Sequence, residues 1–466
     1  MSKRNKRKKY KTRNLQPDNV SNSGKDSVTD NDKENKSAES DNGGGESGDR
    51  VKGSKRLSRW KKILLICGIS VLAIILVLAI VIAAIWHNEI STVASIELIV
   101  DAHEENKSAP VYIMDVSGDY YFDKFIEQGG ASDDGELIQF VVDNITKGIV
   151  PININSPNIG CSSFTCVDAD GNRYFGRNYD FSTTTSMIVR TDPGNGRYAS
   201  ISSVDLQFLG ITDGVYLDSL MQKLICLAAT YAPLDGINEA GVSCGIYMSY
   251  QGAEGEVVAT DQSTDKPDLT STTMLRLILD YAGSVDEAVA LVSKYDLHDS
   301  ANTSFHYMVA DSTGRSAILE WVAADDATDT DGTKRTLRVY YNDDDSVIGK
   351  TEAANEFQYI TNFIVTPDYY SGTEDMKGLD RYNEIAAVIN PDGTNTEGLM
   401  TKEDALEVLK TVGRRRWDSR NGESDSNGIT VWSALYDLTN RTVTWVSNEE
   451  FDNSDSVFTF DFSYLN

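Results

Sequence analysis

Cys161 is the residue whose surroundings best suit nucleophilic chemistry in this 466-residue chain. It directly follows Gly160, and Arg177 and Asp180 come 16 and 19 residues later, beyond a short turn over residues 169–172. A thiol is mostly protonated at neutral pH, so a catalytic cysteine needs a base or a cationic neighbour. A β-hairpin folded about this Gly-containing turn would return its second strand beside Cys161 and bring a guanidinium and a carboxylate close to the thiol.

Histidine is the usual base for a catalytic thiol, but the chain holds only four histidines. Only His298 and His306 lie beyond the predicted hairpin, so a Cys–His pair has few candidates. A chain cut between Gly160 and Cys161 would supply another base, because the freed α-amine has a reference pKa of about 8 and sits on the same residue as the sulfur. The guanidinium would then hold positive charge near the thiolate, and the carboxylate would orient the amine.

The other cysteines fit structural roles better. Cys226 falls in an apolar helix and Cys244 in a strand, where each acts as a small buried hydrophobic residue. Cys166 competes as nucleophile, but it lies only 11 residues before Arg177. An inert core thiol at Cys161, with a purely structural pairing of the arginine and the carboxylate, is the alternative. Five cysteines exclude a disulfide-dense scaffold but leave individual pairings open, and the scarce histidines predict no metal site and no cofactor.

Residues 63–86 form a run of 24 residues without a charged side chain. A helix needs roughly 20 apolar residues to cross a bilayer, so this run predicts a transmembrane helix. A cleaved signal peptide is less favoured, because the run is too long and the preceding arm too extended. Basic residues crowd its N-terminal edge, and the positive-inside rule then places the N-terminus in the cytoplasm and residues 87–466 outside the cell.

The two flanks of the apolar run differ in charge. Residues 1–62 hold 18 Lys and Arg against 9 Asp and Glu, with few large apolar side chains, which predicts a disordered basic cytoplasmic tail. Residues 87–466 hold 25 Lys and Arg against 62 Asp and Glu. So large a negative charge argues against a nucleic acid as the partner of the exported part.

Hydrophobic patterning predicts a stalk over residues 87–108 and a packed domain from Ala109 onward. Helices are predicted at 119–128, 135–148, 217–230, 271–295 (two helices broken near Gly283), 379–389 and 402–412. Strands are predicted at 111–116, 161–168, 173–181, 241–250, 305–310, 316–322, 337–341, 429–437, 442–447 and 457–464. Strands and helices come in blocks, which favours an α+β fold of antiparallel sheets covered by helices over a doubly wound sheet.

The stretch GCSSFTCVDADGNRYFGRNYDF at 160–181 resembles the start of the choloylglycine hydrolase and acid-ceramidase-like linear amide C–N hydrolases, a group of N-terminal-nucleophile cysteine amidases. That group shows a Cys, a short strand, a D/N-G turn and GRN-x-D at the same separations. The resemblance extends over roughly residues 111–466. It is carried there by NEAGV at 238–242, HYMVADSTGRSAILEW at 306–321, YITN at 359–362 and DRY at 380–382.

The resemblance implies a four-layer αββα N-terminal-nucleophile hydrolase sandwich over residues 161–466. In it Cys161 would be the nucleophile, Arg177 and Asp180 its supporting pair, Asn362 an oxyanion donor and Arg381 an active-site cation. The alternatives are structural roles, in which Asn362 only caps a turn and Arg381 is a solvated helix residue.

Two departures from bile-salt hydrolases matter. Met248 stands where those enzymes carry an Asn, which leaves the oxyanion hole intact only if a backbone N–H acts there, and puts bile-salt specificity in doubt. The long segment before Cys161 resembles the acid-ceramidase-like members, which cut themselves. This implies autocleavage at Gly160–Cys161, with residues 109–160 retained as a packed smaller subunit.

The expected function is a membrane-anchored extracellular hydrolase of linear, non-peptide amide bonds, with a small-molecule N-acyl substrate. A catalytically silent ligand-binding module on the same fold and an acyltransferase are the alternatives. The membrane is a partner through residues 63–86, and the sequence leaves homo-oligomers open. Bile salts, penicillin V-like amides, N-acyl amino acids and N-acyl ethanolamines all present an acyl group on nitrogen, and pocket shape decides among them.

Overall fold

The computed structural model describes residues 58–103, 108–148, 160–212, 214–252, 256–323, 334–343, 356–373, 376–421 and 428–465. The chain divides into two compact units, residues 1–71 and 72–466. Most of the predicted cytoplasmic tail, residues 1–57, lies outside the described residues. Residues 149–159, directly before the predicted cleavage point, also lie outside them.

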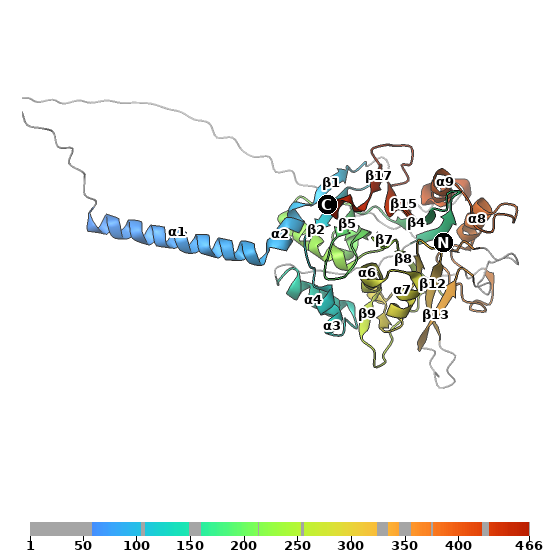
Figure 1. Ribbon diagram of the computed structural model, residues 1–466, viewed down its shortest axis with the longest axis horizontal. Coiled ribbons are helices and arrows are strands. Elements are labelled where there is room, and N and C mark those ends of the chain that lie inside the picture. Colours follow the sequence, from blue (N-terminus) through green and yellow to red (C-terminus); the bar gives the residue numbers. More distant parts are fainter. Residues whose placement is uncertain are drawn as a thin grey trace, which may run out of the picture. The chain divides into compact units, whose positions relative to one another are not determined.

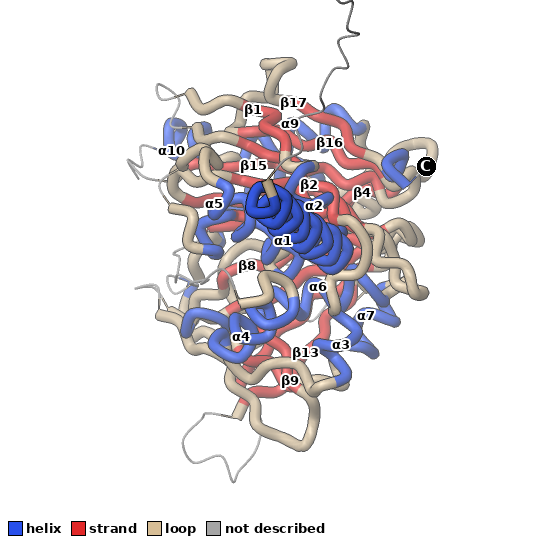
Figure 2. The backbone as a smooth tube through the Cα atoms, turned by 90° about the vertical axis from the view of Figure 1, so that its left-hand side faces the viewer, coloured by secondary structure: helices blue, strands red, loops and turns tan. Residues whose placement is uncertain are grey.

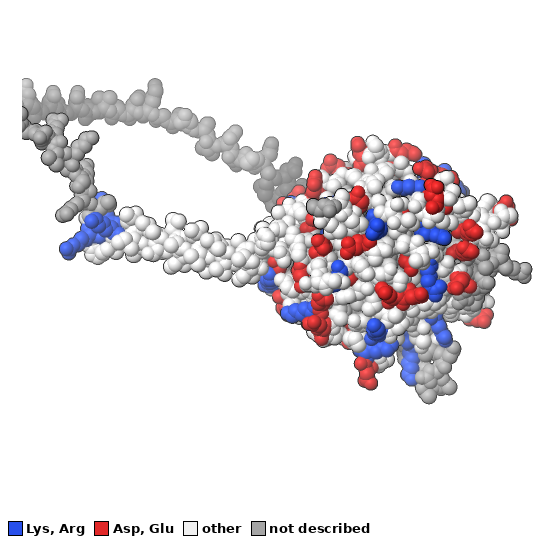
Figure 3. Space-filling view, viewed as in Figure 1, with Lys and Arg blue, Asp and Glu red and all other residues white. Residues whose placement is uncertain are grey.

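Helix α1 (Arg59–Ile85) is 27 residues long, and its length and composition suit a membrane span. It overlaps the predicted span at 63–86. None of its side chains is buried against protein. Lys and Arg side chains gather at its N-terminal end, while the rest of the helix carries no charge (Figure 3).

Helices and strands are interspersed along the rest of the chain (Figure 1). The helices are α2 (His87–Ala94), α3 (Phe122–Glu127), α4 (Asp134–Asn144), α5 (Leu220–Ile225), α6 (Ser271–Tyr281), α7 (Val285–Val292), α8 (Leu379–Ile389), α9 (Lys402–Val412) and α10 (Arg414–Asn421), with short 3₁₀ helices η2 (Leu206–Leu209), η3 (Cys226–Tyr231), η4 (Ser300–Asn302) and η6 (Phe462–Leu465). The strands are β1 (Glu97–Val100), β2 (Val111–Val116), β3 (Gly160–Val167), β4 (Arg173–Phe181), β5 (Ser186–Thr191), β6 (Ser200–Asp205), β7 (Asp235–Asn238), β8 (Ser243–Met248), β9 (Asp268–Thr270), β10 (Asp296–His298), β11 (Phe305–Ala310), β12 (Ser316–Ala323), β13 (Arg335–Tyr341), β14 (Tyr359–Ile360), β15 (Ile429–Asp437), β16 (Thr442–Ser447) and β17 (Val457–Phe460).

The described strands form two large sheets and one small pair. The nine-stranded sheet has the order β1-β2-β5-β6-β7-β8-β11-β12-β13, and the six-stranded sheet has the order β14-β3-β4-β15-β16-β17. Strands β9 and β10 make the small pair. Neighbouring strands are antiparallel except in the β2–β5 and β9–β10 pairs. The predicted α+β class with largely antiparallel sheets is therefore confirmed.

The two large sheets pack against each other, and helices cover their outer faces (Figure 2). Tyr247 on β8 donates a hydrogen bond to Ser163 on β3 at 2.5 Å, and the indole of Trp445 on β16 donates to Ser203 on β6 at 3.3 Å. Helices α6 and α7 contact β8 and β11 on one side, and α8 and α9 contact β3, β4 and β15 on the other. The space between the sheets holds the buried side chains that surround Cys161.

The segment before Cys161 belongs to the packed core. Strand β2 runs parallel to β5 along six paired residues. Phe122, Phe125 and Phe140 all pack on Tyr231, with ring centroids 5.7 to 6.0 Å apart. Burying several aromatic rings together stabilises such an arrangement strongly.

The packed structure begins earlier than the predicted boundary at Ala109. The stretch predicted as a stalk contains α2 and β1, and β1 pairs with β2 at the edge of the nine-stranded sheet. Strands β5, β6 and β7 were also missing from the prediction. Every residue of β6, which reads SISSVD, is buried because both of its faces are covered, so the strand lacks the polar–apolar alternation that identifies a half-exposed strand.

Candidate functional site

The predicted hairpin places the candidate nucleophile as expected. Strands β3 and β4 pair antiparallel, with Gly160 opposite Asp180, Cys161 opposite Tyr179, and Ser163 opposite Arg177. Side chains alternate along a strand, so Cys161 and Arg177 share one face of the sheet and Asp180 lies on the other. The structure thus brings a guanidinium to the thiol face and a carboxylate to the opposite face.

The thiol face is built around Arg177, which is fully buried. Its Nη2 donates to the carbonyl of Ile246 at 2.7 Å, and its Nε donates to Asp235 at 3.3 Å. Its guanidinium lies over the ring of Tyr247, 4.3 Å from the centroid. Its Nη1 is buried and has no hydrogen-bond partner among the described residues. The guanidinium is therefore held by a carbonyl, a carboxylate and an aromatic ring on the face that also carries the thiol of Cys161.

The backbone nitrogen of Cys161 lies in a separate polar cluster. It donates to Oδ1 of Asn362 at 3.0 Å, and Nη2 of Arg381 donates to the same oxygen at 3.1 Å. Arg381 also donates to Oδ2 of Asp180, whose Oδ1 accepts the hydroxyl of Thr430 at 2.7 Å. Cys161, Asp180, Asn362 and Arg381 are thus brought together around one nitrogen atom.

The side chain of Asn362 is held from both ends in the intact chain. Its Oδ1 accepts from Cys161, and its Nδ2 donates to the carbonyl of Met248 at 2.8 Å. Met248 contacts Asn362 through its carbonyl, which is an acceptor, so a backbone N–H of Met248 in the oxyanion hole stays a prediction. The oxyanion role of Asn362 stays a prediction.

The electrostatics of the thiol are a balance of opposing influences. Burial raises the pKa of Cys161 above its ordinary value, Arg177 and Arg381 lower it, and Asp180 raises it. The net direction is upward. In the intact chain the thiol is therefore protonated at neutral pH, and it needs a base to become a nucleophile.

Among the residues that the structure describes, Cys166, Cys226 and Cys244 are buried, and the two histidines beyond the hairpin have partners of their own. All five cysteines are free thiols, and burial raises the pKa of Cys226 to about 12. His306 contacts Glu320 and the carbonyl of Thr361, and His298 contacts two aspartates, so the ring nitrogens of both histidines are engaged away from Cys161. No cluster of potential metal ligands occurs among the residues that the structure describes.

Sequence reasoning missed the residues that support the site from distant strands. Asp235 accepts from Arg177, from the indole of Trp432 at 3.0 Å and from the hydroxyl of Tyr436. Thr430 holds Asp180. The only signal in the sequence was an aspartate inside an apolar stretch, at Asp235, and its partner Trp432 lies almost 200 positions further along.

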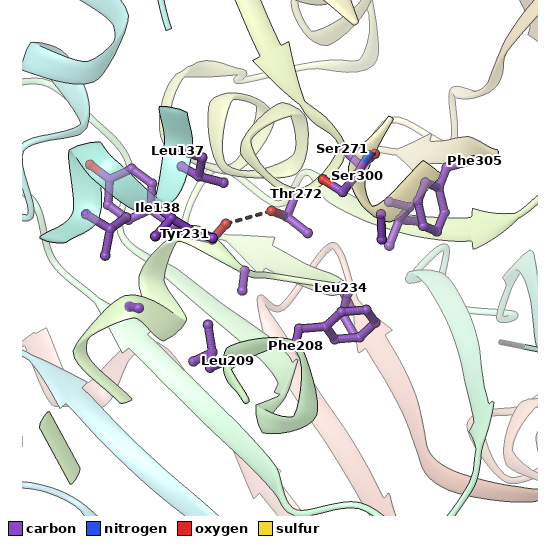
Figure 4. Close-up of a pocket in the computed structure, with 15 residues that line it drawn as sticks. Leu137, Ile138, Phe208, Leu209, Tyr231, Leu234, Ser271, Thr272, Ser300 and Phe305 are labelled. Carbon is purple, nitrogen blue, oxygen red and sulfur yellow. Dashed lines mark hydrogen bonds between the residues drawn. The ribbon is translucent and has the colours of Figure 1, made fainter. Parts of the chain in front are cut away.

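An apolar pocket lies between α4, η3 and strands β8 and β11 (Figure 4). Its volume is about 650 Å³ including the part open to solvent. Leu137 and Ile138 line it from α4, and Ile246 and Phe305 line it from the sheet. None of the five predicted site residues is among its lining, but the carbonyl of Ile246 accepts from Arg177. The pocket and the thiol face therefore share strand β8.

Comparison with known proteins supports one family. Residues 161–325 match the model of the linear amide C–N hydrolases, choloylglycine hydrolase family. No curated protein matches the chain. Among solved structures, a variant of conjugated bile acid hydrolase from Clostridium perfringens is 16% identical with a TM-score of 0.43, covering 66% of this chain and 94% of that chain.

Two further solved structures are similar. Penicillin V acylase from Agrobacterium tumefaciens is 14% identical with a TM-score of 0.37, covering 65% of this chain and 86% of that chain. The Caenorhabditis elegans orthologue of N-acylethanolamine-hydrolyzing acid amidase is 16% identical with a TM-score of 0.34, covering 60% of this chain and 93% of that chain. The family match confirms the resemblance carried by the hairpin motif, because the matched residues 161–325 include Cys161, Arg177 and Asp180.

Proposed function

We propose that this protein is a membrane-anchored extracellular hydrolase that cleaves linear, non-peptide amide bonds of N-acyl substrates, with Cys161 as nucleophile after autocleavage at Gly160–Cys161. The observation that carries the proposal is the hydrogen bond from the nitrogen of Cys161 to Asn362, beside the Asp180–Arg381 pair. Cleavage would convert this amide nitrogen into an α-amine within a set of partners that already surrounds it.

The chemistry follows from the two faces of β3. The amine of Cys161 accepts the thiol proton, and Arg177 stabilises the thiolate. The thiolate attacks the amide carbonyl carbon, and the oxyanion is stabilised by the side-chain amide of Asn362 and a backbone N–H. The C–N bond breaks, the leaving amine takes the proton from the ammonium of Cys161, and an acyl thioester forms. Water then attacks the thioester, loses its proton to the amine, and releases the acid.

The packing of the upstream segment supports a retained small subunit, residues 109–160. Strand β2 lies between β1 and β5, so its backbone stays paired after a cut at Gly160. Tyr120 donates to Asp280 at 2.7 Å, and Tyr281 donates to Asp123, so side chains also join the two parts. The catalytic part would then remain attached to α1 without a covalent bond.

The apolar pocket supports an apolar acyl group as the substrate's larger part. Its walls come from α4 before the cleavage point and from β8 and β11 after it. The hydroxyl of Thr272 donates a hydrogen bond to the carbonyl of Tyr231 at 2.8 Å, so this polar group of the lining has a partner within the protein (Figure 4). Burying an alkyl chain there is favourable by about 0.8 kcal/mol per methylene.

The proposal is tested by mass spectrometry and turnover of the purified full-length protein with a panel of N-acyl amides. We expect a cut at Gly160–Cys161, with Cys161→Ala uncut and inactive and the matched control Cys166→Ala cut and active. Retained turnover in Cys161→Ala, or full activity of an uncut chain, would contradict the proposal. Binding of acyl amides without turnover identifies the silent module, and acyl products on an added amine identify an acyltransferase.

A further inference from the structure

The turn that follows β16 has an unusual backbone. Asn448 and Glu449 both have positive φ angles, 55° and 60°, and the N–H of Glu450 closes the turn on the carbonyl of Ser447 at 3.0 Å. Turns with two consecutive positive φ angles favour Asn followed by Gly, because other side chains are strained there. A Glu at the second position costs free energy that a Gly would not, and such strain concentrates at functional sites.

The carboxylate of Glu449 is buried, with its side chain only 8% exposed. It accepts the backbone N–H of Arg415 at 3.0 and 3.1 Å and the backbone N–H of Thr430 at 3.3 Å. A Cβ atom on Gly413 would lie 2.4 Å from Oε1 of Glu449, so only glycine leaves room for the carboxylate. The strained turn thus places the carboxylate of Glu449 between α10 and β15, where it contacts both elements.

Thr430 connects this position to the candidate site. Its hydroxyl accepts the backbone N–H of Arg414 at 2.7 Å and donates to Asp180 at 2.7 Å. A hydroxyl has one proton, so the bond from Arg414 leaves that proton for the carboxylate of Asp180. The pairing of β15 with β4 also shifts register between Thr430 and Trp432, a bulge of the kind that re-aims side chains next to active sites.

We propose that Glu449 is a positioning residue of the Cys161 site, which holds Asp180 in place through Thr430 and so sets the orientation of the Cys161 amine. This inference rests on the proposed function. The charged groups that face Glu449 are the guanidinium of Arg415, with its Nε 3.7 Å away, and the carboxylate of Asp180 on β4.

Protonation of Glu449 would weaken this support. Burial raises the pKa of Glu449 to about 7, the Arg415 and Thr430 contacts lower it, and Asp180 raises it. Below pH 7 the protonated carboxyl loses acceptor capacity for the two backbone N–H groups. Turnover is therefore expected to fall as the pH drops through about 7.

The test compares Glu449→Gln with Glu450→Gln in the full-length processed protein. Glu450 lies in the same turn, but its carboxylate accepts from Asn453 and Ser456 instead. We expect Glu449→Gln to lower kcat by about 10- to 100-fold at pH 8 with KM nearly unchanged. The fall of kcat below about pH 7 should be less steep in the variant than in the wild type, because only the amine of Cys161 then titrates. Glu450→Gln keeps the wild-type profile.

Two variants of Thr430 separate positioning from folding. Thr430→Val removes the hydroxyl and should reproduce the loss in kcat. Thr430→Ser keeps the hydroxyl and should have a kcat close to that of the wild type. Circular dichroism measures the folded fraction of each variant. A kcat loss that vanishes after correction for the folded fraction overturns the inference, as does a wild-type pH profile in Glu449→Gln.

A second readout works without a substrate. The rate of Cys161 alkylation by iodoacetamide, followed by peptide mass spectrometry between pH 5.5 and 8.5, should show the same dependence on Glu449. If the amide panel gives no turnover, the proposed function fails while the alkylation profile still decides the role of Glu449. Identical alkylation profiles for the wild type and Glu449→Gln, including the absence of alkylation in both, would refute that role.

Discussion

The buried pair of Asp180 and Arg381 allows the structural and catalytic roles of the site to be separated. The two residues are 3% and 4% exposed, and each has a further partner: the hydroxyl of Thr430 for Asp180 and the side chain of Asn362 for Arg381. Three variants are informative, namely Asp180→Asn, Arg381→Met and the double variant. Each single change leaves one buried partner without its counter-charge, and the double change removes both charges.

The burial of both side chains sets the expected losses in the free energy of unfolding. Breaking one side of a buried ion pair costs about 3–5 kcal/mol, because the remaining charge stays desolvated without compensation. Asp180→Asn also turns an amide N–H₂ toward a donor, either Arg381 or Thr430. Replacing both partners removes the desolvation cost as well, so the double variant should lose about 2–4 kcal/mol rather than the 6–10 kcal/mol of an additive sum.

Urea unfolding of the full-length protein in detergent measures these changes. Trp432 stacks on Tyr179 with ring centroids 4.0 Å apart, so its fluorescence reports the integrity of the site. We expect the double variant to regain much of the stability lost in the single variants. Under the proposed function, turnover should stay at least about 100-fold below wild type in all three, because the amine that cleavage would free on Cys161 is no longer oriented. Additive losses within about 0.5 kcal/mol, or wild-type turnover in the double variant, would refute the reasoning.

Three further predictions concern the cleavage point, the pocket and pH. Gly160→Ala places a Cβ 3.1 Å from the Cβ of Asp180, so we expect slower cleavage of a folded chain in a time course on gels, and an unchanged rate would count against tight packing at the junction. Ile138→Trp fills the pocket and should lower turnover of long-chain acyl amides at least about tenfold while sparing acetyl amides; equal effects on both would remove the pocket from the acyl site. Burial raises the pKa of Asp205 to about 6, above its value of 3.8 in an unfolded chain. The folded state therefore binds the extra proton between about pH 4 and 6, and stability falls as pH rises through that window by at most about 3 kcal/mol. Asp205→Asn should flatten this dependence in urea unfolding at pH 4.5 and 7, and parallel curves would show that the carboxyl is not perturbed.

Local signals in the sequence predicted the elements with strong boundaries. Helices α8 and α9 and strands β11, β15 and β16 occupy the predicted ranges. Thr401 caps α9 by accepting the N–H of Asp404 at 3.1 Å, and the turn at Gly171 has the positive φ, 83°, that the hairpin requires. Each of these features depends on residues within about four positions of each other, which a single sequence shows directly.

The elements and contacts that were missed depend on distant partners. Strand β1 is only four residues long and is defined by its pairing with β2. Thr430 reaches Asp180 across 250 positions, and Trp432 reaches Asp235 across 197. The strained position of Glu449 has no local explanation at all, since its carboxylate is useful only where α10 and β15 meet. Nothing in the neighbouring residues encodes these contacts.

The geometry of β3 explains why this site does not need a histidine. The side chain of Cys161 extends toward the buried Arg177, while its nitrogen faces the cluster of Asn362, Arg381 and Asp180. One residue therefore carries both the thiol and the nitrogen atom that cleavage would turn into a base, and each has its own set of partners. In the intact chain the base is an amide nitrogen that cannot accept a proton, and burial keeps the thiol protonated. Under the proposed function, reactivity should therefore arise only once the strand begins at Cys161, and chain cleavage would be the step that controls turnover.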